Sequence, residues 1–250
     1  EETLTGLTTV EYTLSDKDVD GLYDNGKVYL RVDRIGKAED GSSTGILYET
    51  LSKDFIELDV RFADVDSQGN MKLYKERHFK NIGSDAESKA KNYILMNDIE
   101  LTDYTACDFS GSFDGNDKKV TIINGTTGLF GTLSSTANVK DLTVAGSVTR
   151  TAENTGAIAH YNSGNITNCV NEATVSGGTY TGGIAGYSND GTIYGCVNNA
   201  DITISTGHRV GGIVGQQVTP SAIINCINKG DILPISGRNY VGGIAGVSTG

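Results

Sequence analysis

A short phrase repeated four times constrains the fold of this chain more than any other feature of its sequence. It occurs at offsets of 26, 29 and 31 residues, in residues 155–159 (TGAIA), 181–185 (TGGIA), 210–214 (VGGIV) and 241–245 (VGGIA). A second phrase keeps step with the first, in residues 139–144 (VKDLTV, degenerate), 166–171 (ITNCVN), 193–198 (IYGCVN) and 223–228 (IINCIN). Self-similarity at a period of roughly 20–50 residues indicates an array of stacked repeats.

The composition of each repeat indicates strands. The apolar stretches are short, rich in Ile and Val and bounded by Gly, Asn or Asp, and none shows the periodicity of an amphipathic helix. A unit of this size cannot bury its own apolar face, whereas stacked coils can pair strand upon strand around a continuous core. We therefore predict an all-β fold, a right-handed parallel β-helix.

Charge and hydropathy exclude several classes of function. The 250 residues carry a net charge of −11 with no basic cluster, which argues against nucleic acid as a partner. No run approaches the ~20 consecutive apolar residues that a membrane span needs, so we expect no membrane span in this chain. The doubled glycines lack the Lys-Ser/Thr of a phosphate-binding loop, and we expect no cofactor.

The second phrase predicts two internal ladders. In the degenerate copy the apolar positions are Val139, Leu142 and Val144, so Ile166 should point inward and Val170 outward. Two further positions of this phrase share the inward register, so the equivalent residues of successive coils should form two ladders. One ladder is Cys169, Cys196 and Cys226, and the other is Asn171, Asn198 and Asn228. We expect the asparagines at a corner with left-handed backbone, each amide bonding to the next. The doubled glycines should occupy a corner with no room for a Cβ atom.

The cysteines are expected to be reduced. Residues in the same register of neighbouring strands lie about 4.8 Å apart with parallel side chains. A disulfide needs Cβ atoms about 3.8 Å apart and turned toward each other. Zinc is disfavoured because the sequence has no Cys-x-x-Cys pair with a nearby His.

The two ends of the array differ. Residues 84–87 (SDAE) read as a capping-box start of a short helix to about Lys91, followed by a buried strand at 93–96, and this helix would cover the first coil. The last phrase reaches Gly250 before its partner phrase, and residues 236–250 show no cap. We therefore expect that the natural protein continues past Gly250 with further coils, a cap or another domain.

Several segments together resemble the GLUG-repeat proteins. They are 93–99 (YILMNDI), 109–116 (FSGSFDGN), 128–131 (GLFG) and the Gly-Gly-Ile repeats. The resemblance covers residues 81–250 and implies a capped β-helix of a bacterial exported or surface protein, similar to the non-catalytic region of IgA-protease-type zinc metallopeptidases. Those enzymes hold zinc in a His-Glu-x-x-His helix, whereas His78, His160 and His208 are not followed by Glu. The resemblance thus implies an accessory or adhesive segment rather than a protease.

Residues 1–80 read as a separate small β-domain. Alternating apolar and polar residues at 28–32 and 56–62 predict half-buried strands, and a turn at 67–70 leads into a further strand at 71–74. Asp16, Asp18, Asp20 and Asp24 match part of a calcium loop, but Lys27 stands where that loop needs a bidentate Glu. A solvated acidic turn is the better reading, and we expect no metal there.

Candidate catalytic residues have simpler explanations. His208 and Arg209 are similar to basic groups of β-helical pectin-degrading hydrolases, but that chemistry also needs clustered carboxylates. Asp201 and Asp231 occupy equivalent turn positions, so a turn role is favoured. The lone His160 and His208 are expected to be solvated on the surface.

One possible binding surface remains. Alignment of the Gly-Gly phrases places Tyr180, Arg209 and Tyr240 at the same coil position, so they should stack as an exposed column. Tyr and Arg are enriched in binding hot spots, although ordinary surface decoration is the simpler reading. We expect no enzyme but a secreted or cell-surface module, a stalk or adhesin-like surface for a host or matrix protein or glycan. A β-helical carbohydrate-active enzyme is the alternative.

Overall fold

The structure, a computed structural model, describes residues 27–30, 33–37, 46–50, 56–59, 64–204, 208–233 and 240–249, with side chains from residue 65 onward. The chain divides into two compact units, residues 1–62 and 63–250. The acidic segment from Asp16 to Asp24, where we expect no calcium, lies outside the described residues.

The first unit contributes two antiparallel strand pairs. Strand β1 (Lys27–Leu30) pairs with β4 (Ile56–Asp59), with Val28 opposite Leu58. Strand β2 (Asp33–Lys37) pairs with β3 (Ile46–Thr50). The strands predicted from alternation near residues 28 and 56 are therefore present, and they pair with each other.

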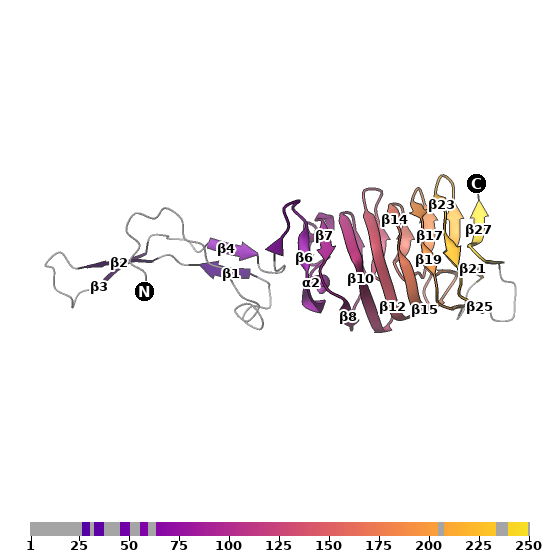
Figure 1. Cartoon of the computed structure of the whole chain (residues 1–250), viewed down its shortest axis with the longest axis horizontal. Helices are drawn as coiled ribbons and strands as arrows, with labels where there is room; N and C mark the ends of the chain where they lie inside the picture. The colour runs from indigo at the N-terminus through magenta and orange to yellow at the C-terminus, as the bar shows by residue number, and fades with distance from the viewer. Residues whose placement is uncertain are drawn as a thin grey trace. The chain divides into compact units, whose positions relative to one another are not determined.

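The second unit is a parallel β-solenoid of about five turns, as the repeats predicted. Figure 1 shows its strands stacked side by side in chain order from magenta to yellow. The first face consists of β7 (Tyr93–Leu95), β10 (Ser112–Gly125), β12 (Asn138–Thr149), β14 (Asn165–Thr167), β18 (Thr192–Tyr194) and β23 (Ala222–Ile224).

Three further faces complete each coil. The long strands β10 and β12 continue into the second face, with β8 (Ile99–Thr102), β15 (Val170–Gly177), β19 (Val197–Asn198), β20 (Ile202–Ile204), β24 (Ile227–Asn228) and β25 (Ile232–Leu233). The third face is β16 (Tyr180–Gly182), β21 (Arg209–Gly211) and β26 (Tyr240–Gly242). The fourth is β9 (Cys107–Phe109), β11 (Phe130–Leu133), β13 (Ala159–Asn162), β17 (Ala185–Asn189), β22 (Val214–Val218) and β27 (Ala245–Thr249).

A hairpin and a helix start the solenoid. Strand β5 (Asp64–Val65) pairs antiparallel with β6 (Met71–Leu73) around the turn predicted at 67–70, where the Asp66 carboxylate accepts backbone N–H groups. Strand β6 then pairs in parallel with β7, so it belongs to the same sheet as the coils. Within the described residues the only α-helix is the short α2 (Glu76–Lys80).

The position of the capping helix differs from our prediction. Residues 84–91 form only a 3-10 turn, η1 (Ser88–Ala90). The Ser88 hydroxyl accepts hydrogen bonds from the backbone N–H groups of Gly83 and Asp85, and Asp85 Oδ1 accepts one from the Ser88 N–H. The reciprocal bonds between Asp85 and Ser88 are those of a capping box, one residue later than predicted, but only a single 3-10 turn follows them. The helix lies earlier because α2 buries Phe79 completely.

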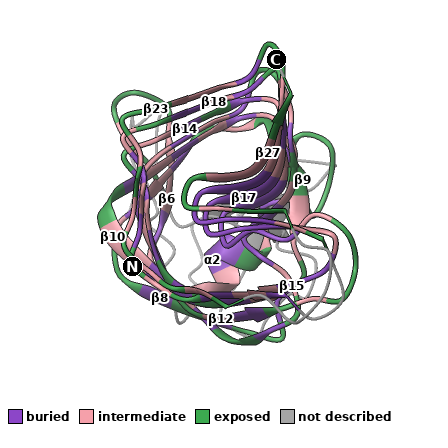
Figure 2. Cartoon of the chain, turned by 90° about the vertical axis from the view of Figure 1, so that its right-hand side faces the viewer, coloured by how far each residue is buried: buried purple, intermediate pink, exposed green. Residues whose placement is uncertain are grey.

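The core begins with aromatic side chains and continues with aliphatic ones. Phe79 of α2 packs edge-on against Phe113 and Tyr104, at ring-centroid distances of 5.5 Å, and Phe109 stacks on Phe130 at 5.0 Å. Later coils bury the Ile of each phrase, namely Ile158, Ile184 and Ile213, and Ile166 and Ile193. Viewed along the coils, the buried residues line the enclosed interior and exposed residues gather at the turns (Figure 2).

The asparagine ladder forms as predicted, but its asparagines do not adopt the left-handed backbone conformation that we expected. Asn171 Nδ2 donates to Asn198 Oδ1, and Asn198 Nδ2 donates to Asn228 Oδ1, both at 2.7 Å. The left-handed residues lie three positions earlier, at Asp141, Asn168, Gly195 and Asn225. The ladder asparagines instead accept from and donate to their own backbone two residues on, as the Asn171 Oδ1 and Nδ2 bonds to Ala173 show.

The three cysteines of the ladder, Cys169, Cys196 and Cys226, stack in neighbouring coils. These three and Cys107 are free thiols. Cys169 and Cys196 are completely buried, while Cys226 of the last such coil is partly exposed. The thiols of Cys169 and Cys196 donate to the carbonyls of Thr167 and Tyr194. Hydrogen bonding with the Cys169 thiol, together with burial, raises the pKa of the Cys196 thiol far above its usual value.

The last coil exposes apolar positions that are buried one coil earlier: Val241 and Ile244 are exposed, whereas their equivalents Val210 and Ile213 are completely buried. Among the helices that the structure describes, none has the length and apolar character that crossing a bilayer demands.

Candidate binding surface

Two rows of side chains run along the solenoid where the third and fourth faces meet. The first row contains the predicted column: Tyr180 pairs with Arg209, and Arg209 with Tyr240. Asn154 occupies the equivalent position in the coil before Tyr180, because its neighbour Thr155 pairs with Thr181, the neighbour of Tyr180. The second row lies seven residues later in each coil and consists of Tyr161, Tyr187, Gln216 and Val247, with Thr132 in front.

Direct contacts join the two rows into one surface, which we call the tyrosine strip (Tyr161, Tyr180, Tyr187, Arg209 and Tyr240). The Arg209 guanidinium lies 4.9 Å from the ring centre of Tyr180 and 5.9 Å from that of Tyr240. Tyr161 and Tyr187 stack at 5.0 Å with an interplanar angle of 16°. Tyr180 and Tyr187 meet edge-on across the rows at 5.7 Å. The strip is therefore a continuous aromatic surface with one cation embedded in it.

The strip contains a cation and buried polar atoms that have no partner among the described residues. Among the described residues no carboxylate pairs with Arg209, and Arg209 Nε has no hydrogen-bond partner. Two further buried atoms of the rows, Asn154 Oδ1 and Gln216 Oε1, also have none. Burial and the neighbouring rings of Tyr161 and Tyr180 raise the pKa of Tyr187, so this phenol stays protonated at neutral pH.

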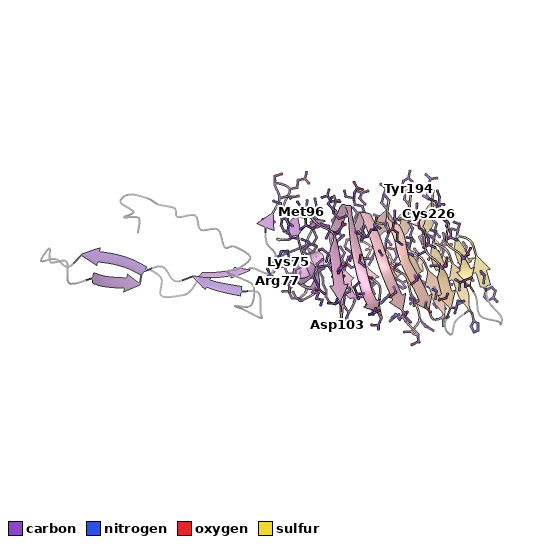
Figure 3. The ribbon with its side chains drawn as sticks, turned by 60° about the horizontal axis from the view of Figure 1, so that its bottom comes forward. Lys75, Arg77, Met96, Asp103, Tyr194 and Cys226 are labelled. Atoms are coloured by element: carbon purple, nitrogen blue, oxygen red, sulfur yellow. The ribbon has the colours of Figure 1, made fainter. Side chains whose placement is uncertain are left out.

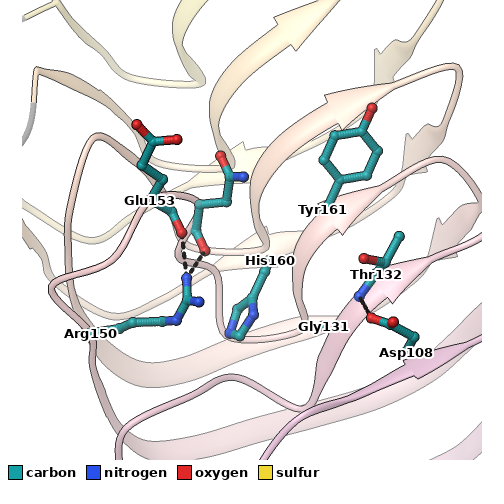
Figure 4. A pocket seen from close by; sticks show the side chains of 8 residues that line it. Asp108, Gly131, Thr132, Arg150, Glu153, His160 and Tyr161 are labelled. Carbon is teal, nitrogen blue, oxygen red and sulfur yellow. Dashed lines mark hydrogen bonds between the residues drawn. The ribbon is translucent and has the colours of Figure 1, made fainter.

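An open pocket of about 440 Å³ lies at the start of the strip. Both rows contribute to its walls, through Asn154 from the first and Tyr161 from the second. Figure 4 shows the side chains that surround it, which come from Asp108, Thr132, Arg150, Glu153, Asn154, His160 and Tyr161, with the backbone of Gly131.

His160 forms the floor of this pocket, and our prediction that it is solvated is wrong. It occupies the coil position held by Gly186, Gly215 and Gly246 in later coils. A Cβ at those glycines would lie 2.3 to 2.5 Å from a backbone nitrogen of the preceding coil's third face. Residues 126–129 form no strand, so the imidazole fits beside them.

The protonation state of His160 follows from its contacts. Its Nε2 lies 3.2 Å from the backbone nitrogen of Gly128 and accepts that N–H, so the ring proton resides on Nδ1. Burial, assisted by the Arg150 charge and opposed by Asp108, lowers the pKa of His160 to about 4. The ring is therefore neutral at pH 7, and its only basic nitrogen is occupied.

Arg150 shapes the wall opposite His160. Its Nη1 donates to the carbonyl oxygens of Glu153 and Asn154, the latter at 3.0 Å, as the dashed lines in Figure 4 show. Burial lowers the pKa of Arg150, although an arginine stays charged at any physiological pH. Arg150 thereby fixes the loop that carries Asn154 into the first row.

The other chemical candidates are structural or exposed. Asp201 Oδ1 accepts the backbone N–H of Asp231 at 2.9 Å, which fits the turn role expected for the pair. His208 is exposed, as predicted. Asp108 Oδ1 accepts the Thr132 N–H at 2.8 Å. Within the described residues no group of His, Cys, Asp and Glu side chains is arranged to hold a metal ion.

Sequence reasoning identified the first row but missed the second. The same alignment that reveals Tyr180 also places Tyr161 and Tyr187 at one coil position, two residues after the last residue of each phrase. Their significance becomes visible only when the corner between the faces brings Tyr187 against Tyr180.

Comparison with known proteins supports the fold. No protein-family model and no curated protein sequence matches the chain. A crystal structure from Bacteroides ovatus, described as a putative immunoglobulin A1 protease, aligns with a TM-score of 0.57 and 19% identity, over 74% of this chain and 74% of that chain. The two proteins share a fold. At this identity nothing more follows, and the GLUG-repeat assignment stays a prediction.

Proposed function

We propose that this chain is a non-catalytic interaction module of a bacterial exported or cell-surface protein, and that it binds its partner through the tyrosine strip. The observation that carries the proposal is the same register position holding Tyr180, Arg209 and Tyr240 in three successive coils. Tyr presents a large contact area at little cost in side-chain entropy, and both Tyr and Arg are enriched in binding hot spots.

The pocket chemistry supports binding over catalysis. A general base needs a free lone pair near the reacting proton, and His160 Nε2 already accepts the Gly128 N–H. One oxygen of Asp108, Oδ1, accepts the Thr132 N–H, which leaves its second oxygen for a ligand.

A β-helical carbohydrate-active enzyme is the second candidate, because two carboxylates, Asp108 and Glu153, line the same pocket. Glycoside hydrolysis uses a pair of carboxyl groups on either side of the scissile bond.

The test is a binding screen combined with an activity assay. The whole chain is screened against arrays of glycans and matrix proteins, and every ligand that binds is incubated with the protein and assayed for new reducing sugar ends. Binding without product, abolished by Tyr180→Ser combined with Tyr240→Ser, is the expected result. Tyr194→Ser is the control, because Tyr194 is an exposed tyrosine on the first face (Figure 3). Release of sugar ends that depends on Asp108 or Glu153 would favour the enzyme.

A further inference from the structure

We propose that the ligand of the tyrosine strip is an acidic polysaccharide, lying along the solenoid with its sugar rings against the edges and hydroxyls of the tyrosines and a carboxylate on Arg209. This inference rests on the proposed function and names the ligand class of the same surface.

The dimensions of the strip favour a chain-like ligand. Successive members of each row lie in neighbouring strands, which are about 4.8 Å apart. The aromatic contacts extend without a break from Tyr161 through Tyr187 and Tyr180 to Tyr240, across four coils. A compact small molecule would cover only one end of this surface, whereas a polymer of rings can use its whole length.

The surface suits sugar rings better than a peptide strand. Peptides commonly bind sheets by adding a strand to an open edge, where unpaired backbone groups supply the hydrogen bonds. Along the middle of the strip the backbone is already paired, because β17 lies between β13 and β22, and β21 lies between β16 and β26, the end strand of its sheet. Only side chains remain for recognition. Tyr161 and Tyr187 cover each other's faces, and Arg209 covers one face of Tyr180 and of Tyr240, so the edges and hydroxyls of these rings are left for a ligand. Phenol hydroxyls can donate to and accept from sugar hydroxyls.

The charge of the strip favours a carboxylate on the ligand. Arg209 is fixed between two rings and has no ion-pair partner among the described residues. A guanidinium held in one plane matches the two oxygens of a carboxylate. The net charge of −11 repels a densely charged polymer, so the carboxylates of the ligand should be widely spaced, with one of them on Arg209.

The pocket at the start of the strip would hold uncharged hydroxyls. Its wall carries the carboxylates of Asp108 and Glu153, which repel acidic groups and accept hydrogen bonds from hydroxyls. The Nδ1–H of neutral His160 adds a donor. Polarity therefore changes along the strip, from hydroxyl-accepting at the pocket to carboxylate-binding at Arg209.

The test uses oligosaccharides of hyaluronan, chondroitin and polygalacturonate, each next to its carboxyl-methylated form, with affinities measured by calorimetry. At least one acidic oligosaccharide should bind. Its affinity should fall about tenfold or more on methylation or in Arg209→Gln, as expected for loss of a charge-assisted hydrogen bond. The methylated form should bind wild type and Arg209→Gln equally, and Tyr187→Ser should weaken both forms. The control, Tyr194→Ser, should change neither.

Other outcomes separate this inference from the proposed function. If no acidic oligosaccharide binds, or if methylation leaves affinity unchanged, the inference is wrong. If array proteins or neutral glycans nevertheless bind through Tyr180 and Tyr240, the proposed function still stands. If nothing binds through the strip, both are wrong. Melting temperatures of all variants, compared with wild type, show that a lost affinity is not caused by unfolding.

Discussion

One histidine, His160, stands where later coils have glycine, and it lines the pocket. Later coils need glycine at this position because a Cβ would collide with the preceding coil, as at Gly186. His160 is accommodated because the coil before it has no strand at that level. The bond from the Gly128 N–H to His160 Nε2 then compensates for burial of the ring.

The neutral His160 predicts a specific dependence of stability on pH. Its pKa is about 4 in the folded state, against 6.5 for an unperturbed histidine. Between pH 4 and pH 6.5 the unfolded chain binds more protons at this histidine than the folded chain does. The contribution of neutral His160 to the free energy of unfolding, up to about 3 kcal/mol, is therefore fully present above pH 6.5 and is lost as the pH falls toward 4. The melting temperature of wild type should therefore fall more steeply on acidification than that of His160→Gln. Parallel pH profiles for the two proteins would contradict the assignment.

The asparagine ladder should make a measurable contribution to stability at a single residue. Asn198 accepts from Asn171 and donates to Asn228 and to the Ala200 carbonyl. Asn198→Ala removes these bonds and leaves buried polar groups unpaired, so we expect a loss of about 2–4 kcal/mol in the free energy of unfolding. The neighbouring Asn199 is exposed, and Asn199→Ala should change the free energy of unfolding by about 0.5 kcal/mol or less. Chemical denaturation measures both, and similar losses would rule out the ladder as the cause.

At the scale of elements, the corner between the third and fourth faces depends on close backbone contact. A Cβ at Gly183 would lie 2.4 Å from the Gly212 carbonyl oxygen and 2.6 Å from Asn198 Cγ. The glycines are needed for this approach rather than for left-handed backbone, since neither Gly183 nor Gly212 has positive φ. The corners at Gly183 and Gly212 thus pack a glycine directly against the asparagine ladder.

Two glycines at the same phrase position provide a matched test of this packing. Gly183→Ala should destabilise the solenoid by about 1–3 kcal/mol, as expected for overpacking. Gly243 has no atom within 4 Å of its would-be Cβ, so Gly243→Ala should be neutral or slightly stabilising. The melting temperatures of both variants test this expectation. Equal changes in melting temperature would show that contact with the next coil is not the reason why Gly183 must be a glycine.

The sequence predicted these elements unevenly. The solenoid, the buried Cys169 and the Asn171 ladder followed from spacing, because stacked repeats must keep equivalent residues in register. The helix at 76–80 did not follow, since its formation depends on burial of Phe79 among aromatic residues far along the chain. The burial of His160 was equally hidden, because it depends on what the preceding coil lacks.

At the scale of the whole molecule, the solenoid converts a repeated sequence into a repeated surface. Each coil returns equivalent residues to one line, so a tyrosine or arginine at one repeat position becomes part of an extended surface. The same stacking aligns Tyr161 with Tyr187, and the corner brings the two rows together. The binding surface is therefore a direct product of the architecture, and its extent is set by the number of coils.

The central claim, that partners bind along the tyrosine strip, is tested most directly by tyrosine labelling. The protein is nitrated with and without a ligand found in the array screen, and modification of each tyrosine is quantified by mass spectrometry. We predict that the ligand protects Tyr161, Tyr180 and Tyr240, while Tyr194 on the first face is modified equally in both samples. Protection of Tyr194, or unchanged labelling of the strip at saturating ligand, would contradict the account.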